Sequence, residues 1–174
     1  MQHAKSEEVE ARFFWIVTSN KREFTFLSEE LYTPKSLDDI IITLERTICC
    51  GRCPVYKLTI FGDGLVAYNG LEFVAVTGRH SVNVSKDKIR QLIAAFKKAK
   101  FFSLNNHYVE FMGTEDPFAI TSLTINGKKK RVRHFLGDYN APRQLKILED
   151  EIDEIVCSDR WVQGIKRKKV DKRY

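Results

Sequence analysis

Hydrophobic and polar residues alternate most clearly between residues 42 and 48. Ile42, Leu44 and Ile48 recur at the two-residue spacing that places side chains on one face of a β-strand. Arg46 falls on that same face, where every other member is apolar. The pattern therefore predicts a strand whose buried face includes an arginine.

The alternation resumes after residues 49–54, which we interpret as a turn. Three residues share one face before the sequence Gly62-Asp63-Gly64, and two return to that face after it. They are Tyr56, Leu58 and Ile60, then Val66 and Tyr68. Glycine readily adopts the positive φ that a short hairpin turn needs, so this stretch predicts a β-hairpin.

Two segments have the spacing of an amphipathic helix. The first spans residues 86–99, with Ser85 as the N-cap and Asp87 in the first turn, where a negative charge suits the helix dipole. The second begins near Pro142, because proline is well tolerated in the first turn of a helix. Its expected apolar stripe consists of Leu145, Leu148, Ile152 and Ile155, and Trp161 is expected to anchor the end that follows.

Shorter patterns predict further strands. Residues 73–76 and 81–84 are expected to form two short strands with Gly78 between them, and residues 105–117 a loop. Asn126-Gly127 is typical of tight hairpins, so residues 120–125 and 130–136 are expected to pair. One face of this pair would carry Leu123, Ile125, Val132, His134 and Leu136, and the other, solvated face Thr124, Arg131 and Arg133.

The order of these elements is strands, helix, strands, helix, with links of hairpin length. This order predicts an α+β fold in which an antiparallel sheet of hairpins has both amphipathic helices packed on one face. We expect three parts: an N-terminal extension with a β-hairpin (residues 1–38), the α+β domain (39–162) and a basic C-terminal tail (163–174).

The composition is that of a globular protein. The chain has 174 residues, 43% of them hydrophobic and 30% charged, which fits one domain with a real core and no need for a disulfide framework. Residues 1–10 contain three acids and no apolar segment, so they do not read as a signal peptide. We therefore expect a soluble, cytoplasmic protein with reduced thiols and no membrane segment.

The formal net charge of +6 is concentrated at one end of the chain. Residues 164–174 contain six lysines and arginines and one aspartate, a net of +5, which leaves 6 − 5 = +1 for the rest. Such tails contact phosphate in some proteins and are simply solvated in others. The charge alone does not identify a nucleic-acid-binding protein.

One element resembles a known family. Cys49-x-Gly51-x-Cys53-Pro54-x-Tyr56, followed by Gly62-Asp63-Gly64, is similar to a family of bacterial and archaeal domains of unknown function. The similarity extends through Phe101-Phe102-x-Leu104, Thr114-x-Asp116, Asn126-Gly127-Lys128 and the final helix, from about residue 39 to 162. It implies a shared fold and no catalytic residue. Many members of that family are exported, whereas we expect no leader in this chain and interpret residues 1–38 as an added extension.

Cys49 and Cys53 are the first candidate functional residues. Their spacing differs from the Cys-x-x-Cys of oxidoreductases, and no helix N-terminus follows to lower a thiol pKa. We expect two small thiols packed in a tight turn. A disulfide with a redox role, or a metal site with scattered histidines such as His80 and His134, are the alternatives.

Glu45, Arg46 and Asp63 form a second candidate set. A buried guanidinium requires a carboxylate partner. Glu45 belongs to the other face of the strand and Asp63 to a turn, whereas Glu149 and Asp153 lie on the helix expected to cover the strand. We therefore expect a structural ion pair between Arg46 and one of these two acids, with a ligand-binding arginine as the alternative.

The most basic stretch of the domain is residues 128–134, with His134 as a further candidate. Its possible phosphate contacts are Lys128, Lys129, Lys130, Arg131 and Arg133. Lysine-rich hairpins also keep edge strands soluble. No phosphate loop, nucleophile elbow or paired carboxylates stand out.

From these observations we expect a small binding module without catalytic residues, cofactor or metal, and a protein is the candidate partner. The alternatives are a nucleic-acid-contacting protein that uses residues 128–134 and the tail, and a thiol, redox or metal site at Cys49 and Cys53.

Overall fold

The computed structural model describes residues 30–109 and 116–163. The chain divides into residues 1–33 and a second unit, residues 34–174, which holds all the elements below. The hairpin expected in the N-terminal extension and the basic tail beyond residue 163 lie outside the described residues. None of the described helices is long and apolar enough to span a membrane.

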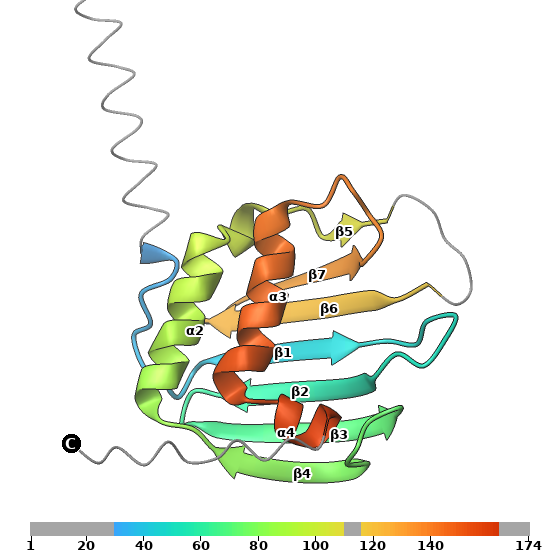
Figure 1. Ribbon diagram of the computed structural model, residues 1–174. Helices are drawn as coiled ribbons and strands as arrows, with labels where there is room; N and C mark the ends of the chain where they lie inside the picture. Colours follow the sequence, from blue (N-terminus) through green and yellow to red (C-terminus); the bar gives the residue numbers. More distant parts are fainter. Residues whose placement is uncertain (1–29, 110–115, 164–174) are drawn as a thin grey trace, which may run out of the picture. The chain divides into compact units, whose positions relative to one another are not determined.

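Seven strands form one sheet in the order β4-β3-β2-β1-β6-β7-β5 (Figure 1). The strands are β1 (Ile41–Arg46), β2 (Val55–Phe61), β3 (Leu65–Glu72), β4 (Gly78–Asn83), β5 (His107–Tyr108), β6 (Phe118–Ile125) and β7 (Lys128–Phe135). Every neighbouring pair is antiparallel except β5 and β7, which are parallel. The predicted α+β fold is confirmed.

Both long helices, α2 (Lys86–Lys98) and α3 (Arg143–Val156), cover the same face of the sheet (Figure 1). Ser85 caps α2 as predicted, because its side chain accepts a hydrogen bond from the backbone N–H of Lys88. A 3₁₀ turn, η1 (Phe101–Ser103), follows α2, and the short helix α4 (Asp159–Val162) follows α3. The face of the sheet opposite α2 and α3 carries no described helix.

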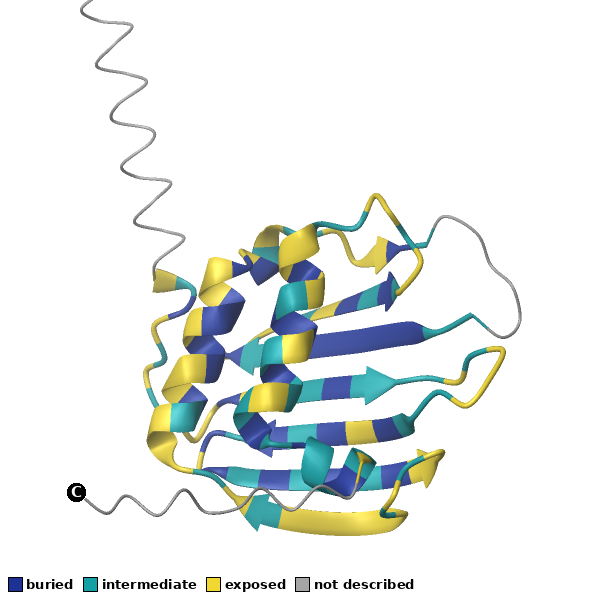
Figure 2. Cartoon of the chain, viewed as in Figure 1, coloured by how far each residue is buried: buried dark blue, intermediate teal, exposed yellow. Residues whose placement is uncertain are grey.

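The core lies between the sheet and these helices (Figure 2). Alternate residues of the strands point into it, as the two-residue period requires. The strands contribute Ile42, Leu44, Leu58, Ile60, Val66, Tyr68, Leu123 and Val132, all at most 1% exposed. The ring of Trp161, in α4, stacks on that of Tyr68 at a centroid distance of 4.8 Å, so the expected C-terminal anchor is confirmed.

Both predicted hairpin turns are present, and their backbone explains the residues found there. Gly64 has a φ of 106°, and Asn126 and Gly127 have φ of 51° and 74°, so each turn uses the left-handed region. Gly62 is required for space: a Cβ on it would lie 1.5 Å from the carbonyl oxygen of Leu37. These turns set the register that decides which side chains share a face.

Some boundaries differ from those predicted. Residues 73–76 are not a strand: β3 continues to Glu72, and Phe73 turns the chain with a φ of 52°. Ile48 and Leu136 are 45% and 39% exposed, because β1 ends at Arg46 and β7 at Phe135 before either residue reaches the core face. In α3 the stripe includes Val156, which is buried, in place of Ile155, which is only half-buried.

Two further differences concern β5, β6 and β7. The region predicted as a loop contains β5, whose two residues add a parallel edge strand to β7. The face of β6 and β7 expected to be solvated is covered at Phe118, Ile120 and Ser122, each at most 9% exposed. The guanidinium of Arg133 lies 3.9 Å from the ring centre of Phe118 and accounts for part of this cover.

Candidate functional site

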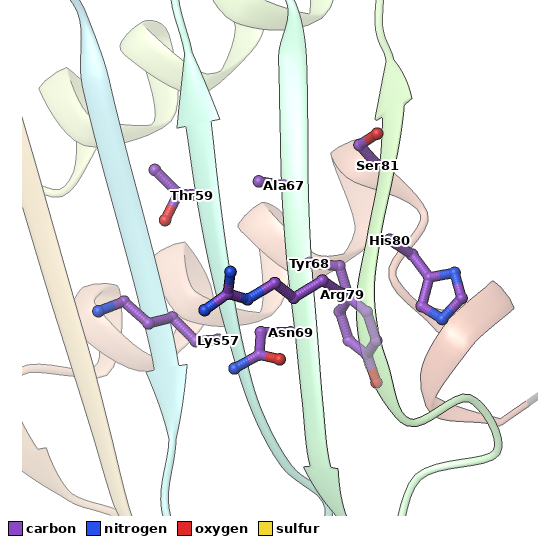
Figure 3. A pocket seen from close by; sticks show the side chains of 8 residues that line it. All are labelled: Lys57, Thr59, Ala67, Tyr68, Asn69, Arg79, His80 and Ser81. Carbon is purple, nitrogen blue, oxygen red and sulfur yellow. The ribbon is translucent and has the colours of Figure 1, made fainter.

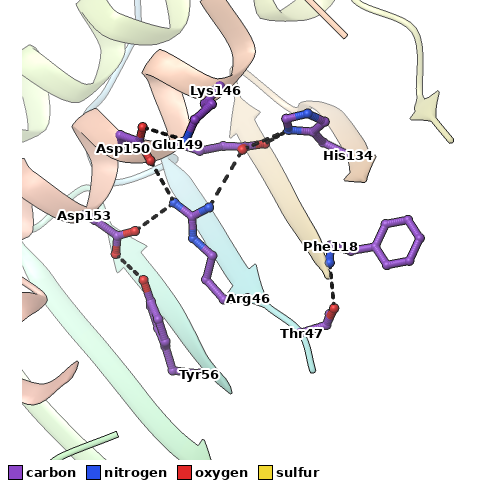
Figure 4. A network of polar contacts seen from close by, with 9 residues as sticks. All are labelled: Arg46, Thr47, Tyr56, Phe118, His134, Lys146, Glu149, Asp150 and Asp153. Carbon is purple, nitrogen blue, oxygen red and sulfur yellow. Dashed lines mark hydrogen bonds and ion pairs between the residues drawn. The ribbon is translucent and has the colours of Figure 1, made fainter. Parts of the chain in front are cut away.

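Arg46 lies on the helix-covered face of β1 and points toward α3 (Figure 4). Its Nη2 lies 3.0 Å from Oδ2 of Asp153 and 3.5 Å from Oδ1 of Asp150, and its Nη1 lies 3.9 Å from Oε2 of Glu149. The predicted ion pair between this arginine and the covering helix is confirmed, and both predicted acids take part.

The same carboxylates bind other buried groups. Tyr56 donates its hydroxyl to Oδ1 of Asp153 at 2.7 Å, and Ser158 donates to the same oxygen at 2.6 Å. Nδ1 of His134 lies 3.0 Å from Oε2 of Glu149, whose side chain is fully buried. Glu149 therefore has two partners from two different strands, β1 and β7.

Burial and charge shift the pKa values in this polar network. Burial raises the pKa of the Tyr56 phenol above its ordinary value, and the charge of Asp153 raises it further. Burial alone would lower the pKa of Arg46, but the charges of Asp153, Tyr56 and Glu149 outweigh that effect and raise it. Because these polar groups bind one another, the network holds the sheet to α3.

Cys49 and Cys53 form a disulfide in the loop between β1 and β2. The expectation of two reduced thiols there is wrong: the turn brings the two Cα atoms to 5.7 Å, within the range that a disulfide spans. Since the sulfurs are bonded to each other, neither is available as a metal ligand. Cys50 and Cys157 take no part in a disulfide.

The other metal candidates are not brought together. No three His, Cys, Asp or Glu side chains within residues 30–109 and 116–163 form a group that could hold a metal ion. His80 is exposed on the edge strand β4, whereas His134 is buried against Glu149. Asp63 accepts a hydrogen bond from the backbone N–H of Leu65 at 2.9 Å, so it closes the hairpin turn.

The basic run divides between the two faces of β7. Lys129, Arg131 and Arg133 face away from the helices, since they pair in register with Thr124, Ser122 and Ile120. Lys128 and Lys130 belong to the opposite face, and the ammonium group of Lys130 donates a hydrogen bond to the carbonyl oxygen of Leu104. Only three of the five predicted phosphate contacts therefore share a surface.

The open face of the sheet holds a pocket of about 450 Å³ (Figure 3). It lies over β2, β3 and β4, on the side away from the helices. The residues whose side chains face it are Lys57, Thr59, Ala67, Asn69, Arg79 and Ser81. Tyr68 and His80 also line the pocket, although the register places their side chains on the other face of the sheet.

Strand register arranges this open face in three rows that run across β4, β3, β2 and β1. The charged row is Arg79, Asn69, Lys57 and Glu45. The small-residue row is Ser81, Ala67, Thr59 and Thr43. The apolar row begins with Asn83 and continues through Leu65, Phe61 and Ile41. The pocket lies over the charged and small-residue rows of β2, β3 and β4. We call the small-residue row, which has the longer side chains of the other two rows on either side, the trough.

The charge of the open face is positive. The strand positions assigned to it by register include five cations, Lys57, Arg79, Lys129, Arg131 and Arg133, and two acids, Glu45 and Glu72. Arg79 and Lys57 are exposed, and both line the pocket. The surface therefore suits a ligand with negative charge.

In the comparison with protein families, residues 40–156 match the family described as a domain of unknown function, DUF6438. The chain belongs to this family.

Apart from Ser158, the polar network around Arg46 and the open face of the sheet lie within the matched residues of the DUF6438 domain. No curated protein matches the chain. The prediction of a domain of unknown function is confirmed, whereas the link of this family to the Cys-x-Gly-x-Cys-Pro-x-Tyr motif stays a prediction.

Sequence reasoning missed the open-face pocket of the DUF6438 domain. Its residues occupy the polar positions of the same alternation that predicted the core, for example Lys57 and Thr59 between Tyr56, Leu58 and Ile60. Their shared face could have been read from the hairpin turn. Which residues of β1 and β4 lie beside them depends on the register and on the strand order.

Proposed function

We propose that the DUF6438 domain is a non-catalytic binding module whose ligand is anionic and lies on the open face of β1–β4. The observation that carries the proposal is the pocket beside Lys57 and Arg79, which is also lined by the small residues Thr59, Ala67 and Ser81. Ligand sites are typically concave, with few polar groups in defined positions. The two cations supply the charge that a carboxylate, sulfate or phosphate would contact.

The composition of this face supports binding over catalysis. The open-face positions of β1–β4 include neither a histidine nor a cysteine. His80 lines the pocket, but the register places its side chain on the other face of the sheet, and its Nε2 lies 3.0 Å from the carbonyl oxygen of Thr77. A hydrolase or transferase needs a nucleophile or a general base at the reacting atom, and the hydroxyls of Thr59 and Ser81 have no such base beside them in their row.

Chromatography of the full chain on immobilised heparin, a polyanion, tests the proposal. The double variant Lys57→Glu/Arg79→Glu removes both pocket cations. Its matched control, Lys86→Glu/Arg143→Glu, makes the same change of charge at the first residues of α2 and α3, where glutamate suits the helix dipole.

We expect the pocket variant to elute at a clearly lower salt concentration than the control variant, since the two differ only in where the charges lie. The contribution of residues 164–174 is common to both. Elution of the two variants at the same salt concentration would show that only net charge matters and would overturn the proposal.

A further inference from the structure

The three rows of the open face differ in chemistry, so the contacts that an elongated ligand makes depend on its orientation relative to the strands. Neighbouring rows lie about 7 Å apart, since side chains on one face of a strand recur every two residues. A ligand that runs along the strands would meet charge, hydroxyls and apolar side chains in succession. A ligand that runs across the strands would keep the charged row on one flank and the apolar row on the other.

We propose that the open face of β1–β4 binds an extended segment of a protein partner, in which acidic and apolar residues alternate, laid across the strands along the small-residue row. This inference rests on the proposed function and names the partner class. Side chains of an extended segment point alternately to its two flanks. Acidic side chains would then reach Lys57 and Arg79, and apolar side chains would pack on Leu65, Phe61 and Ile41.

The dimensions set the length of the segment. Four adjacent strands span three interstrand spacings, about 14 Å at about 4.8 Å each. An extended chain rises about 3.3 Å per residue, so about four or five residues cover the trough. Two acidic and two apolar side chains therefore match the two cations and the three apolar residues on the flanks.

The trough suits a peptide backbone. Ser81, Thr59 and Thr43 present hydroxyls, which donate and accept hydrogen bonds and can satisfy both N–H and C=O groups. Ala67 has no side chain beyond Cβ and lies between Ser81 and Thr59 in the row, so the backbone can approach closely there.

Glu45 restricts which acid positions are favourable. It lies at the β1 end of the charged row, directly opposite Lys57 in the register, and it repels an acidic side chain placed there. Arg79 lies at the β4 end of the same row. The acidic residues of the segment are therefore expected over β4, β3 and β2, and not over β1.

The same face is less suited to a single-stranded nucleic acid. Such ligands stack their bases on exposed aromatic side chains. Among the described residues of the open face, Phe61 and Phe135 are only half-exposed, and Phe118 is covered by Arg133.

NMR titration of the isotope-labelled full chain with two capped peptides tests the inference. One peptide alternates, with the sequence Gly-Glu-Leu-Glu-Val-Gly. The other has the same composition with its acids adjacent, Gly-Leu-Glu-Glu-Val-Gly, so that they point to opposite flanks. We expect the alternating peptide to shift amide signals of β1–β4 and to bind at least about 5-fold more tightly; equal affinities, or shifts confined to other elements, would overturn the inference.

Two isoleucine variants test whether the apolar row contributes to peptide binding, separately from the contribution of the cations. Ile41→Thr removes an apolar side chain that is 39% exposed beside the trough, and Ile48→Thr is its control, because Ile48 is 45% exposed in the loop after β1. We expect Ile41→Thr to weaken the alternating peptide about 3-fold and Ile48→Thr to leave it unchanged. Equal effects of the two substitutions would contradict the role of the apolar row.

A hexathymidylate titration completes the test. If hexathymidylate binds over β1–β4 and the chain shows no preference between the peptides, the partner class is wrong and the proposed anion-binding function stands. If neither peptide nor oligonucleotide binds there, and the heparin variants elute together, both proposals fail.

Discussion

At the scale of a single residue, Glu149 shows how the fold stabilises a buried charge. Its side chain is fully buried, and it contacts Arg46 of β1 and His134 of β7. A buried carboxylate is stable only when its charge and its hydrogen bonds are both matched. The network therefore fastens α3 to two strands that are separated in the sheet by β6.

Replacement of Arg46 by methionine is expected to lower the free energy of unfolding by about 3–5 kcal/mol, the usual cost of leaving buried charges without their partner. Urea denaturation measures this change. The matched control is Lys146→Met, which breaks an exposed pair with Asp150 and should cost about 0.5 kcal/mol or less. Similar losses for the two variants would show that the buried ion pair does not hold the helix.

Tyr56 makes the free energy of unfolding depend on pH in the alkaline range. The folded chain holds the pKa of its phenol above the ordinary value of about 10, because of burial and the charge of Asp153. The unfolded chain therefore releases this proton first as the pH rises. The stabilisation from Tyr56 is complete below about pH 10 and falls above it.

Tyr56→Phe is expected to be less stable than the unmodified chain at neutral pH, because Asp153 loses a hydrogen-bond donor. Its free energy of unfolding should also fall less steeply between about pH 9 and about pH 11. Part of the slope should remain, since burial also raises the pKa of Tyr68. Denaturation at a series of pH values measures both effects, and identical slopes would contradict the account.

At the scale of elements, the loop between β1 and β2 is closed by the Cys49–Cys53 disulfide. The chain has four cysteines, so two thiols should react in the unfolded, unreduced chain and four after reduction. The variant Cys49→Ser/Cys53→Ser should give two in both conditions. Four reactive thiols before reduction would mean that the cysteines are reduced, as expected for a cytoplasmic chain.

Local sequence signals predicted the hairpins and helices because their causes are local. The turn at Asn126-Gly127 needs positive φ at both positions, and the start of α2 needs the cap that Ser85 provides. The two-residue strand β5 has no such signal, since it exists only through its pairing with β7. Residues 73–76 have β-forming residues, but Phe73 turns the chain before they can pair.

Arg46 and its acids could be predicted because a charge on an apolar face is visible in the sequence and demands a partner. The disulfide could not be assigned, since four-residue spacing is compatible with two thiols as well as with a bond. The open-face pocket depends on how β2, β3 and β4 are paired. Asn69 pairs with Lys57 on β2 and with Arg79 on β4, and this register places the two cations in one row. The alternation within one strand shows which residues are polar, but it does not show which residues of other strands lie beside them.

At the scale of the whole described domain, the sheet has two unlike faces. One is covered by α2 and α3 and holds the core and the buried polar network. The other presents ordered rows of cationic, small and apolar side chains over β1–β4. The first face explains the stability of the fold, and the second is where we place its function.

The most direct test of the binding face is side-chain NMR of the full chain during titration with a heparin hexasaccharide. The account predicts that the amide signals of the Asn69 side chain and the Nε–H signal of Arg79 shift together, while Nε–H of Arg143 on α3 stays unchanged. Shifts of Arg143 as large as those of Arg79, or no shift at Asn69, would contradict it.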